Sequence, residues 1–554
     1  MTIAKRLDKI FSICSGSTFC HFISGKDVAE VEKITFRDMD LRSKTIGSLI
    51  AALPGVAPGD QVGFMLGHDP FVLFGFVGCL RQGILPVIMA PPSEKQDPEI
   101  YWSGLKVLIE TNAIKAIITR PDIAVRLSEF AIDIEVVTSE QLLDFGPQKE
   151  LRPNTQPQDT AFIQYSSGTT GLKKGVAVSH AAVLRQVDAY AGQIRLAKTD
   201  CIVSWLPLYH DMGLVACFLM PLLRGIPLVL MDPFLWVVRP VLLFEAIEAY
   251  SGTLCWLPNF AFHHLCRSLP DQGLPKLTTM RAFINCSEPA KAETAEAFVA
   301  KFRRVGMSEE MVQVCYAMAE TVFAVTQTEL LHRPKVVDVD RDRLVSDGIA
   351  KQIMEGRKTA IRRILSVGSP IQGADVEIVD ENGRVLEDGC IGEIRIRADF
   401  MFDGYVGPSF GERSCVSATG HPSGDLGFLL NGELYVTGRK KEVIIVHGRN
   451  FYAHDIEVLV NRCPDVIPGR SVAIGVFDER TASEEIIVVA ETRVNPGDYK
   501  ALRKAVKEEV LKGLDVVVGH VALVPPKWLI KTSSGKISRN QNKAKFLEET
   551  GGLI

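Results

Sequence analysis

A short loop rich in hydroxyl groups and glycine is the segment of this sequence best suited to chemistry on phosphates. It follows the apolar run Ala161–Gln164 and precedes a helical stretch, and it contains Ser166, Ser167, Gly168, Thr169, Thr170, Gly171 and Lys174. Glycine lets backbone N–H groups approach phosphate oxygens, hydroxyls add donors, and the lysine adds positive charge. The spacing is not that of a Walker loop. We predict a phosphate-binding loop, and a flexible turn is the alternative.

Several later clusters add groups that suit a nucleotide and a metal ion. They comprise His210, then Ser287, Glu288 and Pro289, then the segment from Tyr316 to Thr321, and finally Asp425, Arg439 and Lys441. An aromatic face such as that of Tyr316 suits a purine, and a carboxylate such as Glu320 suits a hard cation shared with phosphates. Each cluster also has an ordinary interpretation. Tyr316 suits a core, Glu320 suits a solvated face, a lone histidine is more often structural, and an isolated Gly-Asp is usually a turn.

Lys536 lies near the C-terminus in the polar segment Lys531–Arg539. When a carboxylate attacks a phosphate and pyrophosphate leaves, the attacking and bridging oxygens both carry negative charge. A positioned ammonium stabilises that transition state. A charged tail is more often a solvated end, but this lysine follows all the earlier clusters in order, which favours the catalytic interpretation.

Taken in chain order, these clusters resemble the motifs of the adenylate-forming superfamily, which contains acyl-CoA synthetases, luciferases, peptide-synthetase adenylation domains and fatty acyl-AMP ligases. The resemblance covers nearly the whole chain. One departure is Lys173, where the family usually has proline, and it leaves the hydroxyls and Lys174 in place. The resemblance implies that the chain uses ATP and Mg²⁺ to convert a carboxylic acid, fatty or otherwise apolar, into an acyl-adenylate.

The resemblance also implies a role for each cluster. Tyr316 would stack on the adenine, Asp425 would accept hydrogen bonds from the ribose hydroxyls, and Lys441 would be the pivot between two domains. The residues implied to be catalytic are Lys536, His210 and Glu320, and those implied to bind Mg²⁺ are Glu320 and Thr170. The residues implied to bind the nucleotide are Ser166, Ser167, Gly168, Thr169, Thr170, Gly171, Lys174, Ser287, Glu288, Pro289, Tyr316, Ala317, Met318, Thr321, Asp425, Arg439 and Lys441.

Two segments resemble the fatty acyl-AMP ligase branch of that superfamily. They are Leu206–Leu214, with its Tyr-His-Asp-Met-Gly-Leu ending, and Gly448–Glu457. The branch also carries an insertion where this chain has the charged stretch Arg333–Arg363, for which a solvated loop is the alternative. In the branch the insertion is linked to loss of CoA transfer, so the resemblance implies a phosphopantetheinylated acyl-carrier protein as acceptor.

Two rival functions remain open at this point. An acyl-CoA ligase would form the same adenylate and use CoA as acceptor. A non-catalytic nucleotide-binding relative would have lost its reacting groups, and it is disfavoured because Lys536, Glu320 and Asp425 are present. The acid is not defined, because the aromatic residues that could line an apolar tunnel are core residues first. These residues are Trp205, Phe218, Trp236, Trp256, Phe260, Phe262 and Phe323.

Alternating strand-like and helical runs predict the elements that must position these residues. We expect an α/β fold with a large N-terminal domain of layered sheets over residues 1–439. Phe71–Pro92 is apolar but contains Arg81 and Gln82, so it is expected to be a buried helix and strand. Further strands are expected at Gln61–Met65, Lys115–Thr119, Thr160–Gln164, Cys201–Trp205 and Leu228–Met231, and helices at His180–Ile194 and Ala290–Arg304.

The pattern changes beyond Val367. Short alternating runs predict a smaller antiparallel sheet or barrel-like subdomain over residues 367–439. A small, mobile C-terminal α+β domain is expected over residues 440–554, with a helix near Tyr499–Leu511 and a polar tail. The charged stretch is expected to carry a helix at Asp347–Arg357. The strand-like runs are Asp375–Asp380, Gly392–Arg397, Glu433–Thr437, Glu442–Val446, Val472–Val476 and Glu485–Glu491.

Composition narrows the broad class of protein. The 554 residues exceed what one hydrophobic core supports, so at least two domains are expected. Lys and Arg number 62 against 66 Asp and Glu, a net charge of −4, which gives no sign of nucleic-acid binding. No signal peptide or membrane span is expected. The 12 cysteines form no CxxC pair and suggest reduced, buried thiols in a cytoplasmic protein.

Overall fold

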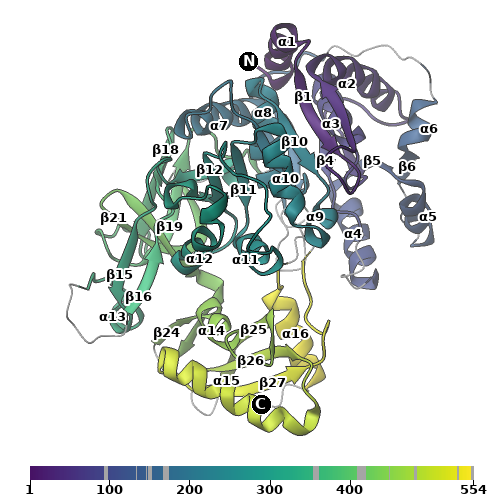
Figure 1. Ribbon diagram of the computed structural model, residues 1–554. Helices are drawn as coiled ribbons and strands as arrows, with labels where there is room; N and C mark the ends of the chain where they lie inside the picture. The colour runs from purple at the N-terminus through teal and green to yellow at the C-terminus, as the bar shows by residue number, and fades with distance from the viewer. Residues whose placement is uncertain are drawn as a thin grey trace.

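A mixed sheet of nine strands forms the centre of the larger of two lobes (Figure 1). The computed structural model describes residues 1–92, 98–130, 132, 134–144, 146, 153–165, 174–353, 361–407, 419–447, 449–478, 483–532 and 536–550. In spatial order the strands are β17 (Ser369–Pro370), β14 (Ala324–Gln327), β13 (Val312–Ala317), β12 (Ala282–Asn285), β11 (Leu254–Leu257), β9 (Ile202–Ser204), β10 (Leu228–Met231), β1 (Thr18–Ile23) and β2 (Val31–Thr35).

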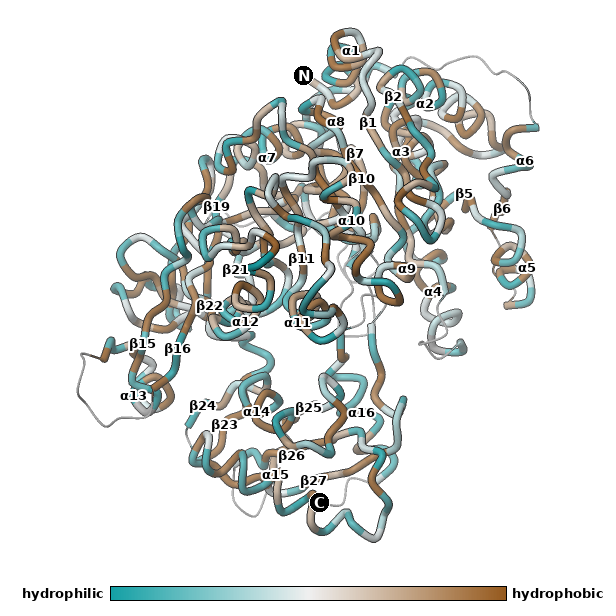
Figure 2. The backbone as a smooth tube through the Cα atoms, in the orientation of Figure 1, coloured by the Kyte–Doolittle hydropathy of each residue, from teal (hydrophilic) through white to brown (hydrophobic). Residues whose placement is uncertain are grey.

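The strands from β13 to β1 are parallel, whereas β14, β17 and β2 pair antiparallel at the two ends of the sheet. The carboxyl ends of the parallel strands therefore meet along one edge, where α/β proteins bind their ligands. The crossover connections include α10 (Val241–Tyr250), α11 (Asn259–Ser268) and α12 (Ala292–Phe302). One hydrophobic core extends around this sheet from Ile3 to Phe402, and Figure 2 shows hydrophobic segments in the central strands.

A second, parallel sheet has the order β4 (Leu85–Ile88), β3 (Gln61–Met65), β5 (Ile114–Thr119) and β6 (Glu135–Thr138). Helix α3 (Phe71–Gln82) follows β3, and nearly all of its residues are buried. Helix α2 (Phe36–Ala51) crosses it where Gly47 meets Gly78, and a Cβ added at Gly78 would lie 2.7 Å from the Gly47 nitrogen. Only glycine at both positions lets the two backbones approach this closely.

A hairpin brackets the predicted phosphate loop. Strand β7 (Thr160–Tyr165) pairs antiparallel with β8 (Gly175–Ser179), and β20 (Gly404–Val406) adds to the outer side of β8. Residues 166–173 of the loop lie outside the described residues. The helix expected after the loop is confirmed as α7 (His180–Gln193), and the short strand β8 lies between the loop and this helix.

The region beyond Val367 forms an antiparallel sheet of β18 (Ala374–Val379), β19 (Gly392–Ala398), β21 (His421–Leu430) and β22 (Glu433–Arg439). The antiparallel prediction is confirmed. The barrel-like form is not seen among the described residues, where pairing ends at β18 and β22. Residues 443–446 belong elsewhere, because β23 (Val443–Val446) pairs only with β24 (Arg449–Tyr452) in the described chain.

The charged stretch forms a small unit of its own. Strands β15 (Val336–Asp340) and β16 (Ile361–Leu365) pair antiparallel, and α13 (Arg341–Ser346) follows β15. The helix expected at Asp347–Arg357 was wrong for residues 347–353, which form a turn and isolated bridges. Residues 354–357 lie outside the described part. The helix instead spans Arg341–Ser346 and places Leu344 and Val345 in buried positions.

The smaller lobe has its own hydrophobic cores. Its sheet has the order β25 (Val466–Asp478), β26 (Ser483–Thr492) and β27 (Val518–Val524), with α14 (Ala453–Val460), α15 (Tyr499–Leu514) and α16 (Arg539–Glu549) around it. The polar tail was therefore incompletely predicted, since α16 is a helix that buries only Asn542 and Phe546. Val345 of α13 belongs to the core of this lobe, although it comes from the charged stretch.

Strand β27 lies at the described edge of its sheet, where backbone carbonyls lack a neighbouring strand. Two cations of α15 bond to these carbonyls. Arg503 Nε donates to the Val521 oxygen at 3.0 Å, and Lys507 Nζ donates to the Gly519 oxygen at 2.7 Å. Capping alternate carbonyls in this way satisfies an edge that could otherwise pair with another chain.

Apart from the helix expected at Asp347–Arg357, the strands and helices predicted for the larger lobe are confirmed within two residues at each end. The apolar stretch Phe71–Pro92 contains the expected buried helix, α3, and strand, β4. The 11 cysteines of the described chain are free thiols, and most are buried, as expected. Within the described residues, no helix has both the length and the apolar character needed to cross a bilayer.

Candidate functional site

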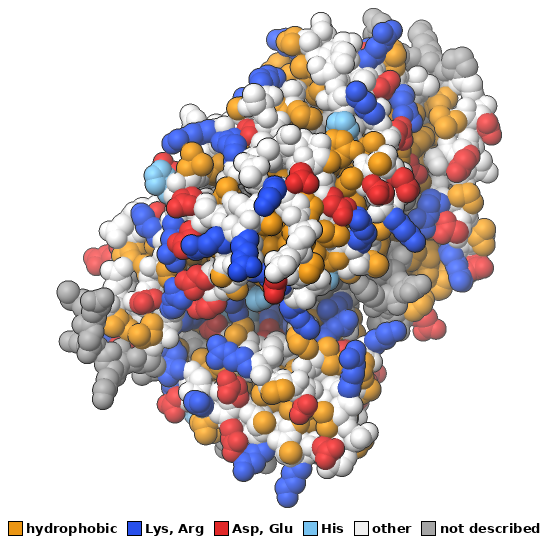
Figure 3. All heavy atoms as spheres, in the orientation of Figure 1, with side chains coloured by type: hydrophobic (Ala, Val, Ile, Leu, Met, Phe, Trp, Pro, Cys, Tyr) orange, Lys and Arg blue, Asp and Glu red, His pale blue; other side chains and the backbone are white. Residues whose placement is uncertain are grey.

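Lys536 connects the two lobes at the edge of the central sheet. Its Nζ donates to the Ser287 carbonyl at 2.7 Å, across 249 residues of sequence. Ser287 follows β12 and takes the left-handed φ of 69°, which is uncommon for a residue with a side chain. The Thr532 N–H donates to the Lys536 carbonyl at 2.8 Å. Figure 3 shows a hollow between the lobes with Lys and Arg side chains around it.

The loop that receives Lys536 is tied to the start of α11. Glu288 accepts a hydrogen bond from the Phe260 N–H at 2.9 Å, and Asn285 Nδ2 donates to Asn259 Oδ1 at 3.0 Å. Asn259 and Phe260 begin the helix after β11. These hydrogen bonds therefore link the loop after β12 to the segment after β11, the neighbouring strand in the sheet. The predicted residues Ser287, Glu288 and Pro289 thus lie on a loop with fixed backbone geometry.

His210 lies in the segment whose Met212 contacts the same loop. It is partly exposed, and its Nδ1 lies 3.7 Å from Asp211 Oδ1, at the start of the π-helix η1 (Met212–Leu219). The Ser287 hydroxyl donates to the Met212 sulfur at 3.9 Å, which joins the two segments. The structure therefore places the segment that carries His210 beside the loop that carries Ser287. A π-helix is rare and often occurs at functional sites.

Tyr316 and Asp425 form the predicted nucleotide side of the site. The Tyr316 hydroxyl donates to Asp425 Oδ2 at 2.6 Å, and Arg439 Nε lies 3.3 Å from Asp425 Oδ1. Asp425 and Arg439 face each other because β21 pairs with β22 in that register. Burial raises the pKa of Asp425, and Arg439 and Tyr316 partly offset this. The carboxylate thus sits in a poorly solvated position with donors on both oxygens.

Glu320 lies in the 3-10 turn η4 (Ala319–Thr321), after β13, and its carboxylate has a partner that the sequence did not reveal. The Tyr405 hydroxyl donates to Glu320 Oε1 at 2.7 Å, and Lys174 Nζ lies 4.9 Å from the centroid of the Tyr405 ring. Tyr405 is 85 residues from Glu320 in the sequence. In the sequence, the only sign that this segment is buried is its aromatic residues, Phe402 and Tyr405 among them. Of the two predicted metal ligands, Glu320 is described and Thr170 lies outside the described residues.

The neighbours of Glu320 have mixed environments. Tyr316, Ala317 and Met318 are half-buried, whereas Thr321 is fully buried and its hydroxyl donates to the Met318 and Phe323 carbonyls at 3.0 and 2.9 Å. Thr321 therefore holds the turn that presents Glu320. Ser166, Ser167, Gly168, Thr169, Thr170 and Gly171 lie outside the described residues, and their predicted roles stay predictions.

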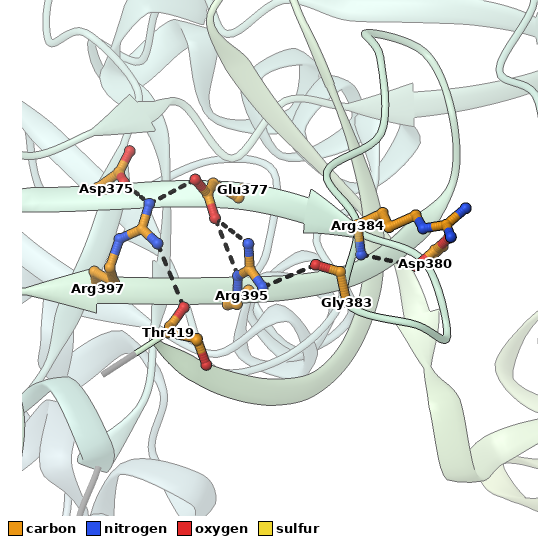
Figure 4. Close-up of polar contacts among 8 residues, drawn as sticks. All are labelled: Asp375, Glu377, Asp380, Gly383, Arg384, Arg395, Arg397 and Thr419. Carbon is orange, nitrogen blue, oxygen red and sulfur yellow. Dashed lines mark hydrogen bonds and ion pairs between the residues drawn. The ribbon is translucent and has the colours of Figure 1, made fainter. Parts of the chain in front are cut away.

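Ion pairs join β18 and β19 close to the point where the chain enters β21 (Figure 4). Arg397 bonds Glu377 at 2.5 Å and the Thr419 carbonyl at 3.4 Å, and Arg395 bonds the same Glu377. Gly420 follows Thr419 with φ 106°, and a Cβ there would lie 3.0 Å from the Arg397 side chain. The side chains of Arg395 and Arg397 therefore lie close to the backbone of Gly420, just before β21.

The predicted pivot lies at the junction of the lobes. Lys441 is exposed in the turn η5 (Lys440–Glu442), and its neighbour Glu442 forms an ion pair with Arg539. A Cβ at Gly438 would lie 2.4 Å from the Tyr452 ring, so the smaller lobe packs closely on the end of β22. Arg539 also bonds Glu457 at 2.7 Å, which fixes the segment that carries Lys536 to α14.

Comparisons with known proteins agree with this arrangement. Residues 16–406 match the family model described as AMP-binding enzyme, and residues 441–552 match the Disco-interacting protein 2-like AMP domain. JamA of Moorena producens (strain JHB), named a medium-chain-fatty-acid–[acyl-carrier-protein] ligase, is 28% identical over 94% of this chain and 91% of its own. A putative acyl-CoA synthetase of Caulobacter vibrioides (strain NA1000 / CB15N) is 27% identical over 90% and 88%.

A similar solved structure comes from studies of fatty acyl-adenylate ligases from E. coli and L. pneumophila. It has a TM-score of 0.90 and 26% identity, and the match covers 100% of this chain and 98% of that one. The fold is therefore the mixed α/β fold of adenylation enzymes, with a large N-terminal and a smaller C-terminal part. Because the AMP-binding model spans well over half of the sequence, the chain belongs to the AMP-binding enzymes, the adenylate-forming superfamily that its motifs resemble.

Proposed function

We propose that this protein is a fatty acyl-AMP ligase that uses Mg²⁺ and ATP to activate an apolar carboxylic acid and passes the acyl group to an acyl-carrier protein. The observation that carries the proposal is the contact between Lys536 and the Ser287 carbonyl. This contact places the Lys536 ammonium at the carboxyl ends of the parallel strands. Glu288, and the segment that carries His210, lie in the same region. A cation there is suited to stabilise charge that develops on transferring phosphate.

In the first step a carboxylate oxygen of the acid attacks the α-phosphorus of ATP, a P–O bond forms, and pyrophosphate leaves. Lys536 stabilises the attacking and bridging oxygens, and His210 orients the carboxylate. Asp425 accepts hydrogen bonds from the ribose, and the Tyr316 ring packs on the adenine. These roles require the Tyr316 and Arg439 contacts of Asp425 to rearrange when the nucleotide binds.

Glu320 fits a role in binding Mg²⁺. It is a half-buried carboxylate with one oxygen occupied by the Tyr405 hydroxyl, and the described residues contain no group of three side chains suited to hold a metal. Mg²⁺ commonly takes one or two carboxylates and completes its shell with phosphate and water. When bound, the ion neutralises phosphate charge. Thr170 would be its second protein ligand.

The acid channel is proposed to lie against Trp205, which follows β9 and comes five residues before His210. The Trp205 and Trp236 rings stack at 3.9 Å, and the Phe260 ring meets Trp205 edge-on at 6.0 Å. Both indole N–H groups are buried without a hydrogen-bond partner in the described structure. The faces of these rings form an apolar wall, which supports a fatty or other apolar acid as substrate.

The second step requires the smaller lobe, proposed as residues 440–554, to turn about Lys441 and withdraw Lys536. A thiol sulfur then attacks the acyl carbonyl carbon, the thiol proton is lost, and AMP leaves. The large domain is proposed as residues 1–439. The contact of α13 and β16 with the smaller lobe supports the acyl-AMP ligase branch, because the charged stretch restrains the lobe that must move. The free thiols support a cytoplasmic location.

Product mass spectrometry tests the proposal. The protein is mixed with ATP, Mg²⁺ and a panel of fatty and cyclic acids, and the reaction is divided between CoA and a phosphopantetheinylated carrier protein. Acyl-AMP that passes to the carrier and not to CoA is the expected result. Acyl-CoA as the product would favour the acyl-CoA ligase alternative, and no adenylate from any acid would contradict the proposed activity.

A further inference from the structure

Tyr405 contacts two groups of the site at once. Its hydroxyl donates to Glu320 Oε1 at 2.7 Å, and Lys174 Nζ lies 4.9 Å from its ring centroid. Glu320 comes from the turn after β13, and Lys174 comes from the hairpin that ends the predicted phosphate loop. The two groups therefore belong to different sheets, and Tyr405 is a side chain that touches both.

The backbone around Tyr405 is fastened to the same two partners. Tyr405 pairs with Val176 in the ladder of β20 and β8, two residues after Lys174. The Asp403 N–H bonds the Ala177 carbonyl at 2.8 Å, and the Phe402 N–H bonds the Glu320 carbonyl at 2.8 Å. Residues 402–405 thus link the strand that follows the phosphate loop to the turn that carries the carboxylate.

The Tyr405 ring is held in one orientation by other aromatic rings. Phe402 meets it at 4.8 Å and 61°, and His421 lies 6.4 Å away at the start of β21. Phe402 and His421 meet edge-on at 5.3 Å. A hydroxyl on so constrained a ring holds its hydrogen-bond partner in a defined position.

We propose that Tyr405 is a positioning residue that sets Glu320 for Mg²⁺ through its hydroxyl and sets Lys174 for phosphate through its ring. The inference rests on the proposed function, because it assumes that Glu320 binds the metal of a nucleotide complex. The hydroxyl bonds one carboxylate oxygen of Glu320, and the second oxygen would bind the ion. The ring face attracts the ammonium, as cation–π pairs do. One side chain thereby fixes the spacing between the metal-binding and phosphate-binding groups.

The test separates the hydroxyl from the ring. Tyr405→Phe keeps the ring and removes the hydroxyl, and Tyr405→Leu removes both. Equilibrium binding is measured with Mn²⁺ by electron paramagnetic resonance in the presence of α,β-methylene-ATP, and with the nucleotide alone by calorimetry. Tyr250→Phe is the matched control, because its hydroxyl bonds the Val28 carbonyl at 2.7 Å and Tyr250 lies outside the site.

Tyr405→Phe is expected to weaken Mn²⁺ binding about tenfold and to leave metal-free nucleotide binding unchanged, since a hydrogen bond to a charged group is lost. Tyr405→Leu is expected to weaken metal-free binding as well, by about threefold. In a Glu320→Gln background, Tyr405→Phe should have no further effect on Mn²⁺. Wild-type Mn²⁺ affinity in Tyr405→Phe, or an undiminished loss in the Glu320→Gln background, would overturn the inference.

These outcomes are distinct from failure of the proposed function. If the wild-type protein forms acyl-AMP and binds Mn²⁺ with the nucleotide analogue, an unaffected Tyr405→Phe variant contradicts only the positioning role. If the wild-type protein binds no Mn²⁺ with the analogue, the metal role of Glu320 and the positioning role both fail. Thermal unfolding of each variant, compared with Tyr250→Phe, shows that the folded protein is being measured.

Discussion

Arg362 Nη2 lies 3.0 Å from Asp455 Oδ2, and this ion pair joins the charged stretch of the larger lobe to α14 of the smaller one. Asp455 also lies 3.1 Å from His454 Nε2, and the Arg362 guanidinium lies 4.9 Å from the Tyr452 ring centroid. Both partners are mostly buried. The pair therefore holds the orientation in which Lys536 reaches Ser287.

Arg362→Gln should loosen this orientation. We expect acyl-AMP formation to fall by about tenfold or more, because a hydrogen bond between charged groups contributes about 1.5–3 kcal/mol. The control is Arg333→Gln, which removes an arginine of the same stretch that pairs with Glu296 and Glu309 inside the larger lobe. Adenylation rates of both variants are measured by pyrophosphate release. Equal losses in Arg362→Gln and Arg333→Gln would contradict the proposed role of Arg362 between the lobes.

The same pair has a defined pH dependence. Burial alone would raise the pKa of Asp455, but Arg362 and His454 hold it well below its usual range. Because the folded-state pKa is the lower one, the pair stabilises the protein above the ordinary carboxyl pKa and loses this effect as pH falls through the folded value. The Tm difference between wild type and Arg362→Gln should thus persist at mildly acidic pH and shrink only in strong acid. A difference that disappears near pH 5 would argue against the pair.

Lys536→Ala should abolish most acyl-AMP formation while ATP still binds. Removing one group that stabilises transition-state charge commonly lowers kcat by about 10²–10³-fold. Lys504→Ala, at an exposed lysine of α15, is the control for a change of charge in the same lobe. Single-turnover formation of acyl-AMP and a nucleotide titration measure the two effects. A normal rate in Lys536→Ala would remove the basis of the proposed mechanism.

Asp425→Asn should separate nucleotide binding from stability. Burial raises the pKa of Asp425, so the ionised form is disfavoured in the folded protein, and the charge costs stability at pH 7. We expect ATP to bind about tenfold more weakly to Asp425→Asn, while Tm stays equal or rises. Calorimetric titration and thermal unfolding measure the two quantities. Unchanged ATP affinity would exclude Asp425 from the nucleotide site.

Trp236→Leu should change which acids are activated. The ring is fully buried against Trp205, so its loss opens a cavity and is expected to lower stability by about 2–4 kcal/mol. If the stack closes the channel, relative kcat/KM should shift toward longer or bulkier acids. Trp528→Leu in the smaller lobe is the control, and it should leave the acid preference unchanged. An unaltered preference in Trp236→Leu would place the channel elsewhere.

The order of motifs could be predicted from the sequence, because each motif is local. Lys536 and Ser287 were both singled out, yet their contact depends on how two lobes dock, which no local pattern encodes. Tyr405 was missed for the same reason. Its hydroxyl contacts Glu320 only because β20 pairs with β8, which brings Tyr405 near Glu320. A single tyrosine among aromatic residues is more often part of the hydrophobic core. The helix at Arg341–Ser346 was misplaced because charge, rather than the buried Leu344 and Val345, dominated the pattern.

The capped edge of β27 affects how copies of this protein behave toward each other. A sheet edge recruits strands from other molecules when its carbonyls are available, and here two flexible cations cover them. These side chains contribute little to the hydrophobic core of the lobe. Loss of Arg503 and Lys507 would therefore show first as concentration-dependent self-association, with the folding of an individual molecule nearly unchanged.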